Sequence, residues 1–343
     1  MKNSMKITMK PTRKAFLAFT FIALIGASMT ACSNSGNSNQ QAKANPAPPT
    51  QSSSPSTSNT TSGEKVATTH KYTDYKGHQV DIPLAPQRII FSGETFSDLL
   101  ALNVKVIGTD IAATKGTVYE KQLNGIEDIG FPINFEKSLN LNPDLIIVAN
   151  TDEKAYEQLS KIAPTIMFDT FASLEERIPL LGEIIGKKAQ ADLWMANYKV
   201  KMQTMMKELQ AAGVKPGETA SVFTYYPGDR LFVMARAGLS QVLYHSGNFK
   251  PTPPIQSVLD EKSGFKQISL ELLPEFAGDR IFILTPTDEE AKRSTDAMIN
   301  SSIWRNLAAV KDNHVYTLPI LQSGSDAITR EWLLQELPKM INK

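Results

Sequence analysis

A short phrase that occurs twice in the chain, 135 residues apart, constrains the fold more than any other feature. In the first copy a Gly-Phe pair leads to Glu136 and, eight residues later, to Asp144 and the apolar segment LIIV. In the second copy a Gly-Phe pair leads to Glu271 and, eight residues later, to Asp279 and the segment RIFIL. The repetition predicts two lobes of one design, although helix, turn, Asp and strand also follow one another in unrelated α/β proteins.

Short apolar segments alternate with helical stretches through both halves of the chain. Segments of this length, rich in Ile and Val and bounded by turns, are typical of buried strands in a largely parallel sheet. The expected strands are 88–91, 104–108, 144–148 and 165–168 in the first half, and 220–223, 280–284 and 314–318 in the second. The pattern predicts an α/β fold in each half.

One long helix is expected between the halves, over residues 188–212. Its apolar positions follow helical spacing, Gly186 precedes it, and Gly213 follows where a helix C-cap would lie. At 1.5 Å per residue such a helix is about 37 Å long, so it predicts a stiff connection. The face expected to be buried carries Ala189, Leu193, Ala196 and Val200, and Met202, Met206 and Leu209 continue it loosely.

Residues 1–31 are typical of a secretory signal peptide. Five Lys or Arg residues lie in the first 14 positions, no acidic residue is present, and an apolar run ends in small residues. Cys32 follows directly and is the only cysteine of the chain. Small residues before such a Cys resemble a bacterial lipobox and predict a lipidated N-terminus, whereas an ordinary cleavage site beside a chance thiol is the alternative. Residues 32–70, rich in Ser, Asn and Pro, are expected to form a disordered tether.

Composition excludes several classes of function. The chain has 36 Lys and Arg against 35 Asp and Glu, a net charge of +1, which gives no reason to expect a nucleic-acid surface. One Cys and four scattered His residues argue against a protein-built metal site. No GxSxG elbow, Walker motif or GxGxxG junction is present, so we expect no enzymatic activity.

The chain from about residue 86 onward resembles the class III solute-binding proteins of ABC importers, and within them the ferric-siderophore and vitamin B12 binding family. The resemblance is carried by PQRIIFSGETFSDLLALNVKVIGT, NFEKSLNLNPDLIIVA, QLSKIAPTI and SIWRNLAAVKDNHVYTL. It implies two Rossmann-like α/β lobes, 71–187 and 214–343, joined by a single long helix over 188–213 with a ligand cleft between the lobes. It also implies capture of a ferric siderophore and its delivery to a permease dimer with its ATPase.

The resemblance gives the repeated glutamates a role. In this family one acidic residue per lobe docks onto arginines of the permease dimer, and Glu136 and Glu271 match by their place in the repeated phrase. Two separated carboxylates that meet arginine forks would fix orientation. The alternative is that each Glu only favours the positive end of its helix.

Ligand-binding residues are expected in the loops beyond the carboxyl ends of the strands. Anionic siderophores call for Lys and Arg, and nearly neutral hydroxamate complexes call for aromatic surfaces. The candidates are Lys115, Tyr225, Tyr226, Arg236 and Arg330. Adjacent tyrosines on a strand point to opposite faces, so at most one of that pair should face the ligand.

The siderophore, not the protein, would hold the iron, and we expect a monomer with no cofactor that meets the membrane only through its lipid anchor. An alternative cargo is haem or cobalamin, with His245 as a candidate haem ligand. A free-metal binder would need clustered ligands that the sequence lacks. An adhesin on a stalk fits the tether but not the duplicated lobes.

Overall fold

The computed structural model describes residues 68–149, 152–245, 247 and 249–342. The predicted signal peptide, the lipidation site Cys32 and nearly all of the predicted tether lie outside the described residues.

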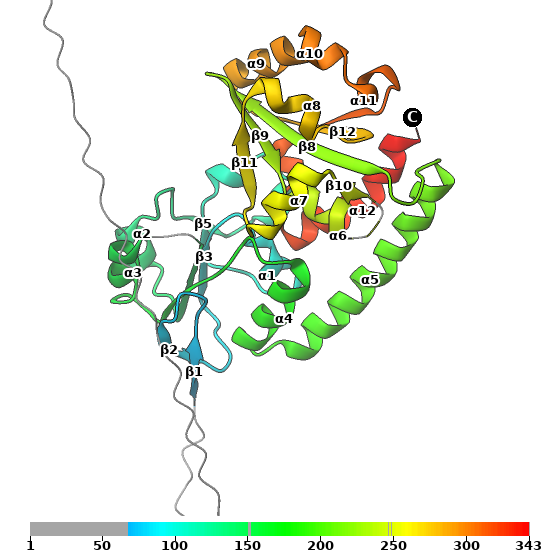
Figure 1. Ribbon diagram of the computed structural model, residues 1–343. Coiled ribbons are helices and arrows are strands. Elements are labelled where there is room, and N and C mark those ends of the chain that lie inside the picture. Colours follow the sequence, from blue (N-terminus) through cyan, green and yellow to red (C-terminus); the bar gives the residue numbers. More distant parts are fainter. Residues whose placement is uncertain (1–67, 150–151, 246, 248, 343) are drawn as a thin grey trace, which may run out of the picture. The chain divides into compact units, whose positions relative to one another are not determined.

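The first half of the described chain forms a parallel sheet with the strand order β5-β4-β3-β6-β7 (Figure 1). All of its neighbouring strands run parallel. Its strands are β3 (Ile89–Ser92), β4 (Gly108–Thr109), β5 (Glu127–Asp128), β6 (Leu145–Val148) and β7 (Thr165–Met167). A separate antiparallel hairpin, β1 (Thr69–Thr73) and β2 (Gln79–Pro83), precedes them.

The second half forms a mixed sheet with the order β11-β9-β8-β12-β13, and a short strand β10 also pairs with β8. Here β9 runs antiparallel to β8 and to β11, while β12 and β13 run parallel to β8. The strands are β8 (Thr219–Tyr226), β9 (Arg230–Met234), β10 (Lys250–Pro251), β11 (Phe265–Ile268), β12 (Arg280–Thr285) and β13 (Val315–Pro319).

The two sheets share a strand order, with β3 and β8 at the centres, but not all strand directions, because β9 and β11 of the second sheet run antiparallel where the prediction expected a largely parallel sheet. The repeated Asp makes equivalent hydrogen bonds in the two sheets. The carboxylate of Asp144 accepts hydrogen bonds from the backbone N–H groups of Gln87 (2.7 Å) and Arg88 (2.9 Å), just before β3. The carboxylate of Asp279 accepts one from Thr219 N–H (2.8 Å), at the start of β8. Each Asp therefore ties the start of the central strand to the strand beside it.

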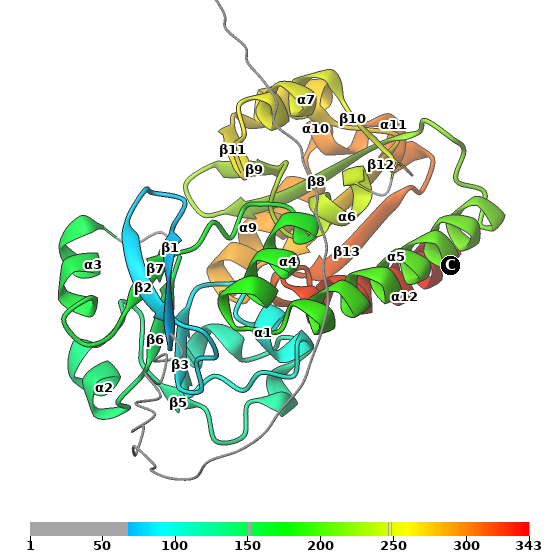
Figure 2. The ribbon, with the colours of Figure 1, turned by 90° about the horizontal axis from the view of Figure 1, so that it is seen from below.

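Helices cover both sheets. In the first lobe α2 and α3 lie on one face of the sheet and α1 and α4 on the other (Figures 1 and 2). No helix among the described residues is long and apolar enough to cross a membrane. The helices are α1 (Ser97–Ala101), α2 (Phe135–Asn140), α3 (Glu153–Leu159), α4 (Leu174–Ile184), α5 (Lys188–Ala211), α6 (Leu239–His245), α7 (Pro253–Asp260), α8 (Leu273–Phe276), α9 (Glu289–Ile299), α10 (Ser302–Arg305), α11 (Ala308–Lys311) and α12 (Ala327–Ile341).

The long helix α5 has 24 residues, but the face expected to be buried is wrong. Leu193 and Val200 are 63% and 62% exposed. The buried positions are Ala191, Tyr198, Met205 and Leu209, and of these the prediction contained Leu209 alone. The two stripes are offset by two residues and both follow helical spacing, so spacing alone could not choose between them. Tertiary packing decides, because Tyr198 and Met205 reach further into the core.

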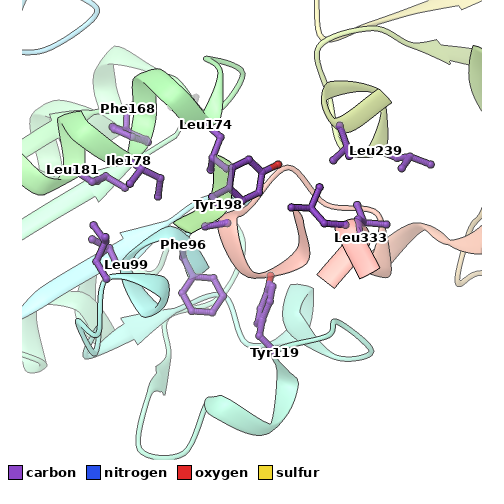
Figure 3. Close-up of a cluster of buried hydrophobic side chains, with 14 of the residues drawn as sticks. Phe96, Leu99, Tyr119, Phe168, Leu174, Ile178, Leu181, Tyr198, Leu239 and Leu333 are labelled. Carbon is purple, nitrogen blue, oxygen red and sulfur yellow. The ribbon is translucent and has the colours of Figure 1, made fainter. Parts of the chain in front are cut away.

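One hydrophobic cluster joins the two lobes. It contains Phe91 and Ile147 of the first sheet together with Val222 and Phe282 of the second. Between the sheets it is filled by side chains from α1, α4, α5, α6 and α12, many of them shown in Figure 3. Figure 2 shows α12 beside α5, so the last helix of the chain packs along the connection between the lobes.

A buried polar network completes this junction. The guanidinium of Arg177 on α4 pairs with Asp98 on α1 at 2.8 Å, and both side chains are fully buried. Asp98 also accepts the N–H of Ala327 (2.7 Å), and Arg177 donates to the carbonyl of Ser325 (2.6 Å). The first turn of α12 is thus held by hydrogen bonds to two helices of the other lobe.

A histidine fastens the β1–β2 hairpin to α3. The ring of His78 stacks on Tyr156 with centroids 3.9 Å apart, and its nitrogens lie 2.8 Å from Asp74 and 3.0 Å from Glu153. The hydrogen bond with Asp74, followed by the weaker contribution of Glu153, raises the pKa of His78 above 6.5. The imidazolium therefore binds this site better than the neutral ring does.

We expect the stability of the protein to depend on pH through His78. A raised pKa contributes stability that is complete below pH 6.5 and is lost as the pH rises through the folded value. Melting temperatures of the wild type and of His78→Gln, measured between pH 5 and about 9, should converge as the pH rises. A difference that stays constant over this range would contradict the assignment.

Candidate functional site

The loops at the carboxyl end of the first sheet enclose a cavity of about 530 Å³ together with residues 320–326, which we call the front cavity. This edge is where open α/β sheets bind ligands. The first lobe contributes residues that follow β3, β4 and β6, and the second lobe contributes the segment that follows β13. The lining residues are Ser92, Gly93, Glu94, Phe96, Thr109, Asp110, Ala113, Thr114, Thr117, Tyr119, Phe131, Ala149, Ile320, Leu321, Gly324 and Asp326.

The charged residues that line the front cavity are acidic. Glu94 accepts a hydrogen bond from the hydroxyl of Thr170 (2.7 Å), and Asp110 is partly exposed. Asp326 is buried at the start of α12, where it accepts hydrogen bonds from the hydroxyl of Ser97 and the N–H of Thr329. Burial, with the charge of Asp98 in addition, raises the pKa of Asp326.

A row of aromatic rings crosses the antiparallel part of the second sheet. The ring of Tyr226 lies 6.1 Å from that of Phe232, which lies 5.8 Å from that of Phe265. Phe265 in turn lies 6.4 Å from Phe171 of the first lobe. We call these four residues the aromatic row. They are partly or largely exposed, so the row offers an apolar surface that ends between the lobes.

The alternation of a strand produces this surface. Along β9, Leu231 and Val233 are buried in the second core, whereas Phe232 and Met234 are partly exposed. Arg230 begins the exposed series, and its guanidinium lies 5.6 Å above the ring of Tyr226. Sequence reasoning missed Phe171, Phe232 and Phe265. The period-two pattern R-L-F-V-M-A-R over 230–236 is the signal that could have found Phe232.

A second, smaller cavity of about 230 Å³ adjoins the row, and we call it the side chamber. The hydroxyl of Thr170 donates to Glu94 of the front cavity, and the next residue, Phe171, lines the side chamber, so one short segment contacts a residue of each cavity. The side chamber is lined by Phe171, Ser173, Ala235, Arg236, Gln241, Tyr244, Leu259 and Arg330.

The structure brings some of the predicted ligand residues together and separates others. Arg236 and Arg330 both line the side chamber, and Tyr226 lies at the far end of the aromatic row. Lys115 is exposed on the other lobe, directly after Thr114 of the front cavity. Tyr225 points into the second core, where its hydroxyl donates to Asp229 (2.7 Å) and burial raises its pKa to about 12.

The repeated glutamates are exposed and have no ion pair among the described residues. Glu136 lies in the first turn of α2, and Glu271 lies in a 3-10 turn (Leu270–Leu272) before α8. Exposed apolar side chains accompany both, Leu139 at 59% and Leu272 at 39%.

The described residues contain no group of three His, Cys, Asp or Glu side chains that could hold a metal ion. The side chain of His245, the candidate haem ligand, lies outside the described part of the chain.

Comparisons with known proteins agree with this architecture. The family model described as periplasmic binding protein matches residues 91–320. The iron(3+)-hydroxamate-binding protein YxeB of Bacillus subtilis is 32% identical over 254 residues, covering 71% of this chain and 76% of YxeB. The iron(3+)-hydroxamate-binding protein FhuD of Bacillus subtilis is 28% identical and covers 94% of this chain and 96% of FhuD.

A solved structure with the same fold is that of Staphylococcus aureus SirA complexed with staphyloferrin B. It superimposes with a TM-score of 0.71 at 25% identity, over 80% of this chain and 98% of SirA. The two-lobe α/β architecture expected from the repeated phrase is therefore confirmed.

We expect Asp326→Asn to stabilise the protein above the folded pKa of Asp326. Asparagine keeps an oxygen that can accept from Ser97 and Thr329 but carries no charge beside Asp98. A raised carboxyl pKa means that wild-type stability falls as the pH rises from 3.8 to the folded value and then stays lower. Thermal unfolding should show a gain of a few degrees at neutral pH that disappears in acid. An equal difference at every pH would contradict the assignment.

Proposed function

The chain belongs to the periplasmic binding protein family, and from this premise we propose that it captures a ferric siderophore outside the cytoplasm and delivers it to an ABC importer. Members of this family bind substrates and do not transform them, so the protein is a binding protein and not an enzyme. The iron is cargo held by the siderophore.

We further propose that the siderophore is of the hydroxamate type, and the aromatic row is the observation that supports this. Ferric hydroxamate complexes have little net charge and apolar flanks, which suit a surface of partly exposed rings better than a cluster of cations. The acidic lining of the front cavity disfavours a strongly anionic complex. The names of YxeB and FhuD, both iron(3+)-hydroxamate-binding proteins, support the same class.

In this proposal Tyr226 and Phe232 supply the apolar contact, and Arg236 donates to the hydroxamate oxygens. Lys115 contributes from the other lobe. Tyr225 is left out because its ring packs in the core. Arg330 is too deeply buried, at 1% exposure, to touch a ligand that stays on the aromatic row.

The junction between the lobes supports modest closure around a preformed site. A continuous core and a fully buried ion pair join the lobes, so a wide opening would expose both to water. Ligand binding should therefore change the relative position of the lobes only slightly.

For delivery, we propose that Glu136 and Glu271 dock onto arginines of the two permease subunits, as the family resemblance implies. Both carboxylates are exposed and have no ion pair in the described structure, which leaves them available. We also propose that the protein is a monomer anchored by a lipid on Cys32.

The first experiment is a binding titration followed by tryptophan fluorescence. Iron-free protein is titrated with ferric hydroxamate, catecholate and citrate-type siderophores, and with haem and cobalamin. We expect saturable binding of a hydroxamate complex. Binding only of haem or cobalamin would move the protein to the alternative cargo, and preference for an anionic siderophore would contradict the role of the aromatic row.

Substitutions in the row should weaken that binding. We expect Phe232→Ala and Tyr226→Ala each to raise the Kd about tenfold or more, because each removes a large apolar contact. Tyr225→Phe is the matched control, since it alters the neighbouring core tyrosine and should leave the Kd unchanged. Equal effects of Tyr225→Phe and Tyr226→Ala would mean that the losses come from a disturbed strand.

The docking proposal predicts that capture and transport can be separated. Glu136→Ala combined with Glu271→Ala should abolish uptake of the iron complex by cells while the Kd for the siderophore stays the same. Glu157→Ala with Glu275→Ala is the control, because it removes one exposed carboxylate from each lobe outside the repeated positions. Unchanged uptake in the first double variant would exclude the docking role.

A further inference from the structure

We propose that the side chamber binds a small anionic group, a carboxylate or an inorganic oxyanion, against the buried guanidinium of Arg330. The anion is either free in solution or an arm of the bound siderophore. Only the second source rests on the proposed function.

The first observation is a contrast among the buried arginines. Arg177, Arg280 and Arg330 are 0%, 4% and 1% exposed. Arg177 pairs with Asp98 at 2.8 Å, and Arg280 pairs with Glu218 at 2.7 Å. For Arg330, no carboxylate oxygen of the described residues comes within the 4.0 Å that defines an ion pair.

The partners that Arg330 does have are neutral. Its guanidinium donates to the side-chain oxygen of Gln241 (3.0 Å) and to the carbonyl of the same residue (3.5 Å). It lies 5.6 Å from the ring of Tyr198, and its Nε has no hydrogen-bond partner. The charges of Arg330 and Glu175 both act on Tyr198, in opposite directions, and burial raises the pKa of this tyrosine.

A charge removed from water without a counterion is strongly unfavourable, and buried charges in proteins are normally paired. Neutral dipoles and one aromatic face offset only part of this penalty. An anion beside Arg330 would supply the counter-charge that Asp98 and Glu218 supply to the other two arginines.

In the side chamber, an anion beside Arg330 would also lie near a second cation, Arg236. Arg330 lines the chamber together with Arg236, whose side chain makes one hydrogen bond to the described residues, from Nη1 to the carbonyl of Lys262 (3.2 Å). A guanidinium has five N–H donors, so Arg236 keeps donors for a ligand. With a volume of about 230 Å³ and apolar walls from Phe171, Tyr244 and Leu259, the chamber suits a small group.

The test uses the purified full-length chain without siderophore. Thermal unfolding and calorimetry are recorded while sodium acetate, sodium phosphate or sodium chloride is titrated, with chloride as the reference at equal ionic strength. We expect acetate or phosphate to raise the melting temperature saturably, as a ligand of the folded state does. Absence of a saturable effect of either anion would overturn the proposal.

Two methionine variants show whether Arg330 is responsible for the binding of the anion. Arg330→Met should weaken the anion at least about tenfold and should unfold near the wild-type temperature without anion, because it removes an unpaired charge. Arg177→Met is the matched control: it leaves Asp98 buried without its partner and should lower the melting temperature sharply. If Arg330→Met does not fold, Arg330→Gln replaces it in the same titrations, because it also removes the charge, and an unchanged anion affinity in either variant would overturn the proposal.

The source of the anion is decided by repeating the siderophore titration with and without acetate or phosphate. An affinity for siderophore that falls as the anion rises means that an arm of the siderophore occupies the side chamber. An unchanged affinity means a free anion. If no siderophore binds while the anion does, the proposed function fails and the anion site stands.

Discussion

The ion pair between Asp98 and Arg177 is the constraint on which the rest of the molecule depends. Both side chains are fully buried, so neither can lose the other without leaving a charge in the core. The pair also forms hydrogen bonds with Ser325 and Ala327, which fix the start of α12 against α1 and α4. Because α12 also packs along α5, this one network sets the relation between the two sheets.

The binding surfaces follow from that relation. The front cavity needs loops of the first lobe and the segment before α12, and the aromatic row needs Phe171 of the first lobe to meet Phe265 of the second. Both are complete only because the junction holds the lobes at a fixed distance. A stiff junction favours a preformed site, where less conformational entropy is lost on binding.

The sequence predicted the architecture well because its signals were local. Asp144 and Asp279 marked equivalent strands, and the strands that follow them were found, whereas the strand expected over 104–108 is the short β4 (Gly108–Thr109). Signals that depend on tertiary packing failed. The buried face of α5 was assigned to Leu193 and Val200 instead of Tyr198 and Met205, since both stripes have helical spacing. The burial of Arg330 could not be predicted from the sequence, because it depends on contacts with Gln241 and Tyr198, which are far away in the chain.

The distance in sequence between the buried ion pair and its partners at α12 has a consequence for how the protein unfolds. Asp98 and Arg177 belong to the first lobe, yet Ala327 lies 229 residues after Asp98 and Ser325 lies 148 residues after Arg177. When α12 detaches, α1 loses the helix that packs on it and the buried ion pair meets water. Neither lobe keeps its core without α12, so the two lobes should unfold in one cooperative transition.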